Sequence, residues 1–207
     1  MTKGTGPVTR RLVCTELRGD GLLLRPWDPA SDADAEAMLT GVTDPEFKLW
    51  NNPAKPIEDL AGAREALRNR ARQWDEGVAG SYCVTDEVTG RILGSISLIS
   101  VYWPNRNGTI GYWVLPDARG KRVATRSLGL LADWAFGLGV HRLALDHVVA
   151  NEASCRVAER CGFVGEGILR GSHLNADGTF SNAHMHARLA TDRPATPATS
   201  TTPADKA

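Results

Sequence analysis

Four cationic side chains crowd the turn and the expected helix start that follow residues 110–116: Arg119, Lys121, Arg122 and Arg126. The N-terminus of a helix already carries partial positive charge, so cations are mildly unfavourable there. Free backbone N–H groups at a helix start, wrapped by a turn that contains Gly120, form a binding site for an anion. The pattern therefore indicates a phosphate or pyrophosphate site, with a solvated basic turn as the alternative.

Histidines and cysteines could take part in acid–base or metal chemistry. Imidazole titrates near neutral pH, so His173, His184 and His186 are candidates for a general base. His184 and His186 share one face of an expected strand, but no third ligand is placed, and catalytic zinc normally has three protein ligands. We therefore expect sheet-surface histidines and no metal ion. The cysteines form no Cys-x-x-Cys pair and are expected to be reduced and mostly buried: Cys14, Cys83, Cys155 and Cys161.

Four aromatic residues on or near loops could line a substrate pocket: Trp50, Tyr102, Trp103 and Tyr112. Each of them could equally belong to the core. Trp50 lies in a stretch rich in proline and asparagine, and the loop that carries it is our preferred substrate gate. Tyr112 and Trp113 are neighbours in an expected strand, so their side chains should point to opposite faces of the sheet.

A strand, a turn and a helix must position the basic cluster. Residues 110–115 are aromatic and β-branched enough for a strand, which Pro116 ends. Apolar residues then recur at three- and four-residue steps from the turn at Gly120 to Gly139, which predicts a helix. Residues 142–149 read as a second buried strand. A strand–helix–strand unit of this kind makes its two strands parallel neighbours.

The remaining elements follow from apolar periodicity and turn residues. Strands are expected over residues 11–15, 22–27, 81–85, 92–101, 164–169 and 180–189, and helices over residues 33–39, 57–76 and 151–161. The stretch 43–56 has turn chemistry throughout and is expected to be a loop or a broken helix.

Length and charge limit the classes of protein to consider. With 207 residues the chain is expected to form one domain over residues 11–190, after a flexible N-terminus at 1–10 and before a disordered Pro/Ala/Thr tail at 191–207. The 24 basic and 24 acidic residues cancel, whereas a nucleic-acid binder would show a basic excess. No signal peptide or membrane-spanning run is found, so we expect a cytoplasmic protein without a membrane partner.

Two motifs resemble the GNAT N-acetyltransferase superfamily. Residues 119–124 resemble its acetyl-CoA pyrophosphate loop, except that Arg122 stands where the family usually has a glycine. About thirty residues later a second signature matches in register: Asn151, Ser154, Val157, Glu159, Arg160, Gly162 and Phe163. The resemblance covers residues 22–189 and is nearest to the RimJ/RimL-like branch of ribosomal-protein N-terminal acetyltransferases. It implies the GNAT α/β (α+β) fold, a mixed, mostly antiparallel sheet with a central splayed parallel strand pair and helices on both faces.

The resemblance also implies an acetyl-CoA-dependent N-acetyltransferase, in which a primary amine attacks the thioester directly within a ternary complex. The amine would belong to a peptide N-terminus or to a small molecule, and a homodimer is left open. Backbone N–H groups near Trp113 and Val114 would face the acetyl oxygen, Asn151 would bind the pantetheine arm, and Ser154 would be a proton donor near the sulfur. The pyrophosphate would bind the loop and helix start: Arg119, Gly120, Lys121, Arg122, Val123, Ala124 and Thr125.

The general base is not identified by this resemblance. Members of this branch often carry a glutamate where this chain has Thr109, which cannot accept a proton at neutral pH. A water relay or another residue would have to replace it. Thr109 and Arg122 together motivate an alternative function, a non-catalytic acyl-CoA-binding module of the same fold. A nucleotide-phosphate binder of another fold is disfavoured, because the loop lacks both the P-loop ending and the dinucleotide glycine spacing.

Overall fold

The computed structural model describes residues 11–53 and 55–192. The expected flexible segment 1–10 and the expected tail from residue 193 onward lie outside the described residues. None of the described helices combines the length and the apolar character that a membrane span requires.

Eight strands form one sheet in the order β1-β2-β3-β4-β5-β6-β8-β7. All neighbouring strands are antiparallel except β5 and β6. Their bounds are β1 Leu17–Gly19, β2 Leu22–Pro26, β3 Gly80–Asp86, β4 Ile92–Tyr102, β5 Asn107–Val114, β6 Arg142–Val148, β7 Val164–Leu174 and β8 Phe180–Leu189. The predicted mixed, mostly antiparallel sheet is confirmed.

Side chains cap the starts of most of the described helices. Their bounds are α1 Asp32–Thr43, α2 Pro45–Trp50, α3 Leu60–Glu76, α4 Val123–Gly137 and α5 Glu152–Arg160, with a 3-10 turn at Pro116–Ala118. Ser31, Asp44, Asp59 and Asn151 accept a backbone hydrogen bond at the starts of α1, α2, α3 and α5. The predicted helix end at Gly77 is confirmed, because this glycine adopts the left-handed conformation.

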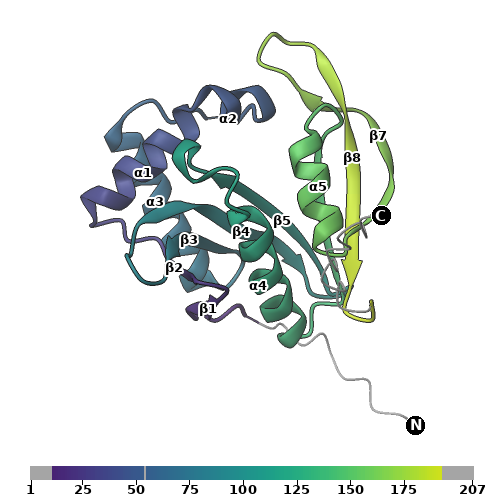
Figure 1. Ribbon diagram of the computed structural model, residues 1–207, viewed down its shortest axis with the longest axis horizontal. Helices are drawn as coiled ribbons and strands as arrows, with labels where there is room; N and C mark the ends of the chain where they lie inside the picture. The colour runs from purple at the N-terminus through teal and green to yellow at the C-terminus, as the bar shows by residue number, and fades with distance from the viewer. Residues whose placement is uncertain (1–10, 54, 193–207) are drawn as a thin grey trace, which may run out of the picture.

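Two apolar cores separate the sheet from its helices. Leu22 and Leu24 of β2 and Tyr82 of β3 are buried on the face that α4 covers (Figure 1). Cys83, the neighbour of Tyr82, points to the other face and belongs to the core formed with α1 and α3. Alternating side chains of one strand thus serve both cores, and the predicted placement of helices on both faces is confirmed.

The parallel pair β5–β6 is short and then opens. Only three residue pairs join these strands, from Asn107 with Arg142 to Thr109 with Ala144. Beyond them β5 continues to Val114 and β6 to Val148 without pairing to each other. Figure 1 shows α5, β7 and β8 diverging from the rest of the molecule toward the top of the view. The predicted splayed parallel pair is confirmed, and it leaves a wedge in the middle of the sheet.

Some predicted boundaries are wrong. Residues 11–15 form no strand, and the first strand begins at Leu17 instead. The stretch 43–56, expected to be a loop or a broken helix, contains α2, which follows the end of α1 after a break at Asp44. Asp44 caps α2, and Pro45 occupies its first turn, where a missing N–H costs nothing. Two elements are longer than predicted: α1 extends to Thr43 and β7 extends to Leu174.

Candidate active site

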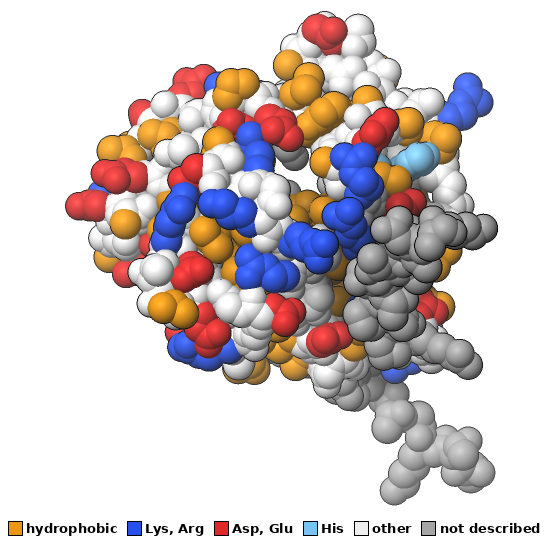
Figure 2. Space-filling model, in the orientation of Figure 1, with side chains coloured by type: hydrophobic (Ala, Val, Ile, Leu, Met, Phe, Trp, Pro, Cys, Tyr) orange, Lys and Arg blue, Asp and Glu red, His pale blue; other side chains and the backbone are white. Residues whose placement is uncertain are grey.

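A cavity of about 330 Å³ lies between α2, the end of β5, the start of α4 and α5. Figure 2 shows Lys and Arg side chains gathered around a hollow on this face of the molecule. The cavity brings together most residues that the resemblance implies for the donor: Trp113, Val114, Arg119, Gly120, Arg122, Val123, Ala124, Thr125, Asn151 and Ser154. Lys121 is absent from the lining, and its ammonium group donates instead to the carbonyl of Asp117 at 2.9 Å.

The turn before α4 forms one wall of this cavity. Gly120 and Arg122 both have positive φ, at 74° and 56°. No side chain caps α4, and the first helical hydrogen bond runs from the N–H of Arg126 to the carbonyl of Arg122 at 3.0 Å. The N–H groups of the first turn therefore keep no acceptor within the helix, as at any helix start. Such a turn suits an anion.

Arg119 is held by α2. Its guanidinium contacts the carboxylates of Asp44 and, at 2.8 Å, Glu46. Burial alone would raise the pKa of Asp44, but hydrogen bonds from Arg119 and from the backbone of Phe47 outweigh it and lower this pKa below its usual value. Asp44 thus stays ionised while it both caps α2 and anchors the loop that precedes α4.

Two hydroxyl groups meet where the cavity reaches β5. The Tyr112 and Ser154 hydroxyl oxygens lie 2.8 Å apart, and either group can donate the hydrogen bond. The side chain of Asn151 accepts the Ser154 N–H at 3.1 Å, so Asn151 rather than Ser154 caps α5. Burial raises the pKa of Tyr112 to about 12, although the hydrogen bond with Ser154 lowers it in part. The pair therefore holds a proton at neutral pH.

The prediction that Tyr112 and Trp113 face opposite ways is confirmed. The indole of Trp113 lies against α1 and stacks on Trp27, with ring centroids 6.1 Å apart. Tyr112 points instead toward α5. Both residues lie in the part of β5 that has lost its β6 partner, so some backbone N–H groups there face the wedge.

A second cavity of about 120 Å³ fills this wedge between β5 and β6. It shares Trp50, Asn51, Tyr112, Asn151 and Ser154 with the first cavity. Asp146 and His147 of β6 line it as well, and neither was singled out from the sequence. Their position near the carboxyl end of a predicted parallel strand, where α/β sheets bind ligands, was the available signal.

Two predicted pocket residues lie elsewhere. Tyr102 pairs with Asn107 at the beginning of β5, whereas along this strand the smaller cavity begins at Ile110 and the larger one at Tyr112. With about 3.3 Å per strand residue, Ile110 is roughly 10 Å from Asn107, and neither Tyr102 nor Trp103 lines a cavity. Tyr102 is exposed and Trp103 packs against the core, so the structure does not bring this pair to the site.

The three predicted base candidates line neither cavity: His173, His184 and His186. The expectation of sheet-surface histidines is wrong for His186, which is buried beneath α5.

Two further basic residues were missed. Arg156 and Arg160 follow each other by one helical turn on α5 and line the larger cavity.

Known proteins resemble this chain in sequence and in fold. The family described as "Acetyltransferase (GNAT) domain" matches residues 21–164. "Putative ribosomal N-acetyltransferase YdaF" of Bacillus subtilis (strain 168) is 37% identical over 98 residues, which are 47% of this chain and half of that relative. "Probable N-acetyltransferase YjcK" of the same strain is 26% identical and covers 85% of this chain and 98% of its own length.

Among solved structures, the ribosomal L7/L12 alpha-N-protein acetyltransferase RimL in complex with coenzyme A has the same fold. Its TM-score is 0.75 at 21% identity, over 84% of this chain and 98% of that chain.

Proposed function

Because the chain belongs to the GNAT acetyltransferase family, we propose that it moves an acetyl group from acetyl-CoA to a primary amine. The amine of a peptide N-terminus is the first acceptor class to consider, because relatives of this chain carry ribosomal acetyltransferase names. The observation that carries the proposal is the pair of cavities joined at Tyr112 and Ser154. The larger cavity has residues suited to bind acetyl-CoA, and the smaller cavity gives the amine a separate path to the thioester.

The residues around the larger cavity offer groups that can bind the pyrophosphate and the pantetheine arm of coenzyme A. The turn at residues 119–125 offers backbone N–H groups for a pyrophosphate, and a Cβ added at Gly120 would meet no atom within 4 Å, so the turn is open on that side. Arg156 and Arg160 add positive charge across the cavity. Asn151 uses its amide oxygen in capping α5, which leaves its amide N–H groups to bind the pantetheine arm.

The wedge has the parts that a direct attack needs. Backbone N–H groups around Trp113 and Val114 can stabilise the negative charge that grows on the acetyl oxygen. Ser154 can donate a proton to the leaving thiolate and regain one from Tyr112 through their hydrogen bond. Asp146 places a carboxylate on the wall of the smaller cavity, where it attracts an ammonium group and can receive its proton.

Acceptor profiling tests this proposal. Thiol release from acetyl-CoA should be followed with peptides of varied first residue and with small amines. We expect turnover with a peptide N-terminus and a Michaelis constant that depends on that residue. Measurable acetyl-CoA binding without turnover on any amine would favour the non-catalytic module. Calorimetry with coenzyme A against ATP separates both from a nucleotide-phosphate binder.

The hydroxyl pair gives a sharper prediction. Ser154→Ala should lower kcat by roughly 100-fold with a small change in the KM for acetyl-CoA, since general acid catalysis contributes about 10²–10⁴-fold. Tyr112→Phe should have a similar effect, and the double variant should be little worse than either one, because the two groups act through one hydrogen bond. Tyr102→Phe, at the far end of the sheet, is the matched control and should leave kcat unchanged. Additive losses would contradict a shared proton path.

A further inference from the structure

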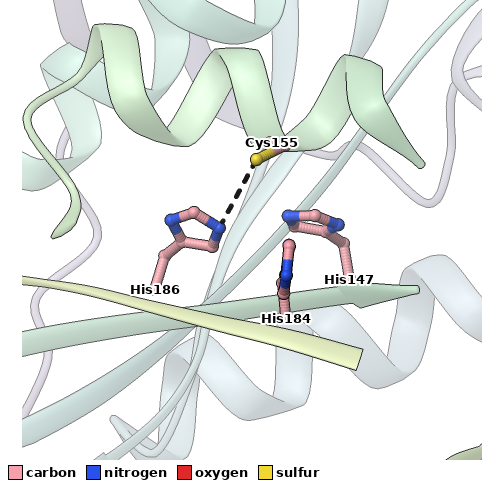
Figure 3. A group of neighbouring side chains, drawn as sticks. All are labelled: His147, Cys155, His184 and His186. Carbon is pink, nitrogen blue, oxygen red and sulfur yellow. Dashed lines mark hydrogen bonds between the residues drawn. The ribbon is translucent and has the colours of Figure 1, made fainter. Parts of the chain in front are cut away.

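Four side chains with metal-binding atoms meet beneath α5: His147, Cys155, His184 and His186 (Figure 3). Each offers one ring nitrogen or its sulfur, and these four atoms all lie within 4.8 Å of one another. His147 and His186 are buried, and His184 and Cys155 are partly buried. Figure 3 shows the three imidazoles rising from the strands toward the thiol on the helix above them.

The fold explains why these residues meet. His184 and His186 are two apart on β8 and therefore share one face. His147 of β6 is directly opposite His184 in the antiparallel ladder, so its ring joins the same face. Helix α5 covers that face, and the sulfur of Cys155 lies 3.8 Å from the Nε2 atom of His186. Three elements far apart in sequence thus contribute to one cluster.

The histidines carry buried nitrogen atoms that lack a protein partner. Among the described residues, His147 Nε2, His184 Nδ1 and His186 Nδ1 are buried without a hydrogen bond. In His186 the nitrogen near Cys155 is Nε2, whereas Nδ1 lies toward Gly165 of β7. The Nδ1 atom of His147 lies 2.9 Å from the carbonyl oxygen of Val148 and must donate to it, because a carbonyl can only accept. In the neutral ring the Nε2 atom then presents a lone pair. A backbone carbonyl that fixes the tautomer in this way is the usual support of a metal-binding histidine.

Three imidazoles packed together make a poor structural core without an ion. Their ring centroids are 5.2 to 5.9 Å apart. Burying polar nitrogen atoms without partners is costly, and a hydrophobic residue at each position would fill the same space at no such cost.

We propose that His147, Cys155, His184 and His186 bind one Zn²⁺ ion. The expectation of no metal, which rested on the lack of a third ligand, is thereby replaced. One thiolate and three imidazoles are a ligand set that suits tetrahedral zinc, which is borderline soft. Zinc–nitrogen bonds of about 2.0–2.1 Å and a zinc–sulfur bond of about 2.3 Å put the ligand atoms roughly 3.3–3.7 Å apart. Zinc binding therefore requires the four ligand atoms to move closer together than their present spacing of up to 4.8 Å.

The site is structural in kind. Four protein ligands complete a tetrahedral shell and leave no open position for a substrate. The ion joins α5 to β6 and β8, on the side of the wedge away from β5. Cys155 follows Ser154 directly, so a fixed Cys155 also fixes the hydroxyl that meets Tyr112. The metal would thus act as a positioning element for the candidate active site, and its binding can be measured without any acetyltransferase activity.

The full chain, purified without a polyhistidine tag and stripped with a chelator, should be dialysed against Zn²⁺ or Co²⁺. We expect one ion per chain and, with Co²⁺, both the visible bands of a tetrahedral complex and a thiolate-to-cobalt charge-transfer band. Cys155→Ser should abolish the charge-transfer band and weaken affinity by roughly 100-fold or more, since even indirect partners of metal ligands contribute 10–100-fold. His184→Gln should weaken affinity similarly. Zn²⁺ should raise the melting temperature of the parent and not of the Cys155→Ser variant.

Matched controls come from the same residue types outside the cluster. Cys14→Ser removes an exposed thiol, and His173→Gln removes a histidine of β7. Both variants should bind one ion as the parent does. Circular dichroism of each stripped variant separates lost binding from lost folding. Less than stoichiometric binding by the folded parent, or an unchanged cobalt spectrum in folded Cys155→Ser, would overturn the proposal.

Discussion

Arg122 has the backbone conformation that the family glycine would adopt without strain. Its φ of 56° and ψ of 23° are left-handed, and it occupies the N-cap of α4 without supplying a side-chain cap. A residue with a Cβ pays about 1–2 kcal/mol for this conformation. The departure from the family pattern therefore keeps the shape of the turn and adds a guanidinium group beside the cavity.

Arg122→Gly should stabilise the fold by roughly 1 kcal/mol, because glycine adopts positive φ freely and this gain exceeds its larger loss of chain entropy. Chemical denaturation measures that change. The Arg122→Gly variant should bind acetyl-CoA at least as tightly as the parent, which calorimetry measures. A tenfold loss of affinity, about 1.4 kcal/mol, would instead make the Arg122 side chain a phosphate ligand.

The contrasting variant is Gly120→Val. Its φ of 74° is unfavourable for a β-branched residue, although a Cβ there would meet no neighbouring atom. Affinity for acetyl-CoA should fall severely because the turn must change its shape. Unchanged affinity would mean that the turn does not bind the donor.

The turn at residues 119–125 and the pair Asn151 and Ser154 could be singled out from the sequence because both belong to local motifs, and the structure places most of these residues on one cavity. The sequence did not predict the hydrogen bond between Tyr112 and Ser154, which are 42 positions apart. The sequence also did not predict that His147 and Cys155 lie next to His184 and His186. Contacts of this range depend on strand register and helix docking, which periodicity alone does not give.

Close packing between α1 and β5 depends on one glycine. A Cβ added at Gly41 would lie 2.2 Å from a ring atom of Trp113, which no real contact allows. Trp113 is in turn held by Trp27 on the other side. Helix α1 therefore sits close to the sheet only because residue 41 has no side chain, and its approach fixes the β5 backbone beside the wedge.

Gly41→Ala should destabilise the protein by roughly 1–3 kcal/mol through overpacking. Gly129→Ala, in the interior of α4 with no atom within 4 Å of the added methyl, is the matched control. That variant should gain up to about 1 kcal/mol, since alanine is the better helix former. Thermal denaturation of both variants checks the opposite signs. A neutral Gly41→Ala would show that α1 can move away from the sheet at little cost.

The helices and hairpins were predictable where apolar spacing and glycine or proline boundaries agree, as for α3 with Gly77. For the short helix α2 the sequence left a loop and a broken helix both open, because α2 has no buried residue and its start depends on the single cap Asp44. That cap also binds Arg119 of the turn before α4, a partner 75 residues away. A helix held by tertiary contacts leaves little trace in periodicity.

Stability of the whole molecule in acid should depend strongly on one buried ion pair. Asp34 of α1 accepts two hydrogen bonds of 2.7 Å from Arg25 of β2, and the carboxylate is 2% exposed. Burial raises the pKa of Asp34, but bonds from Arg25, the Asp28 N–H and Ser31 together lower it below its usual value. Because the pKa of Asp34 is lower in the folded state than the value of about 3.9 in the unfolded state, its ionised carboxylate stabilises the fold at pH values above 3.9. This stabilisation is lost as the pH falls through the folded-state pKa.

Asp34→Asn should therefore be less stable than the parent at pH 7, by about 3–5 kcal/mol if Arg25 is left unpaired. Below pH 4 its stability should fall less steeply, by up to about 1.4 kcal/mol per pH unit, because one linked proton is removed. Urea denaturation from pH 2 to pH 7 measures both effects. Glu36→Gln, on the exposed side of α1, should keep the slope of the parent. Equal slopes in Asp34→Asn and the parent would contradict the assignment.

Because β5 and β6 separate, amide exchange of β5 can be used to detect acetyl-CoA in the cavity. In an ordinary interior strand every amide is held by one neighbour or the other, yet about half of those from Ile110 to Val114 point away from β4 toward the gap. Their deuterium uptake should be fast in the free protein and slow once acetyl-CoA occupies the cavity, whereas Asn107 to Thr109 should change little. Exchange mass spectrometry would then read occupancy from the backbone, without a label and before any acceptor is known.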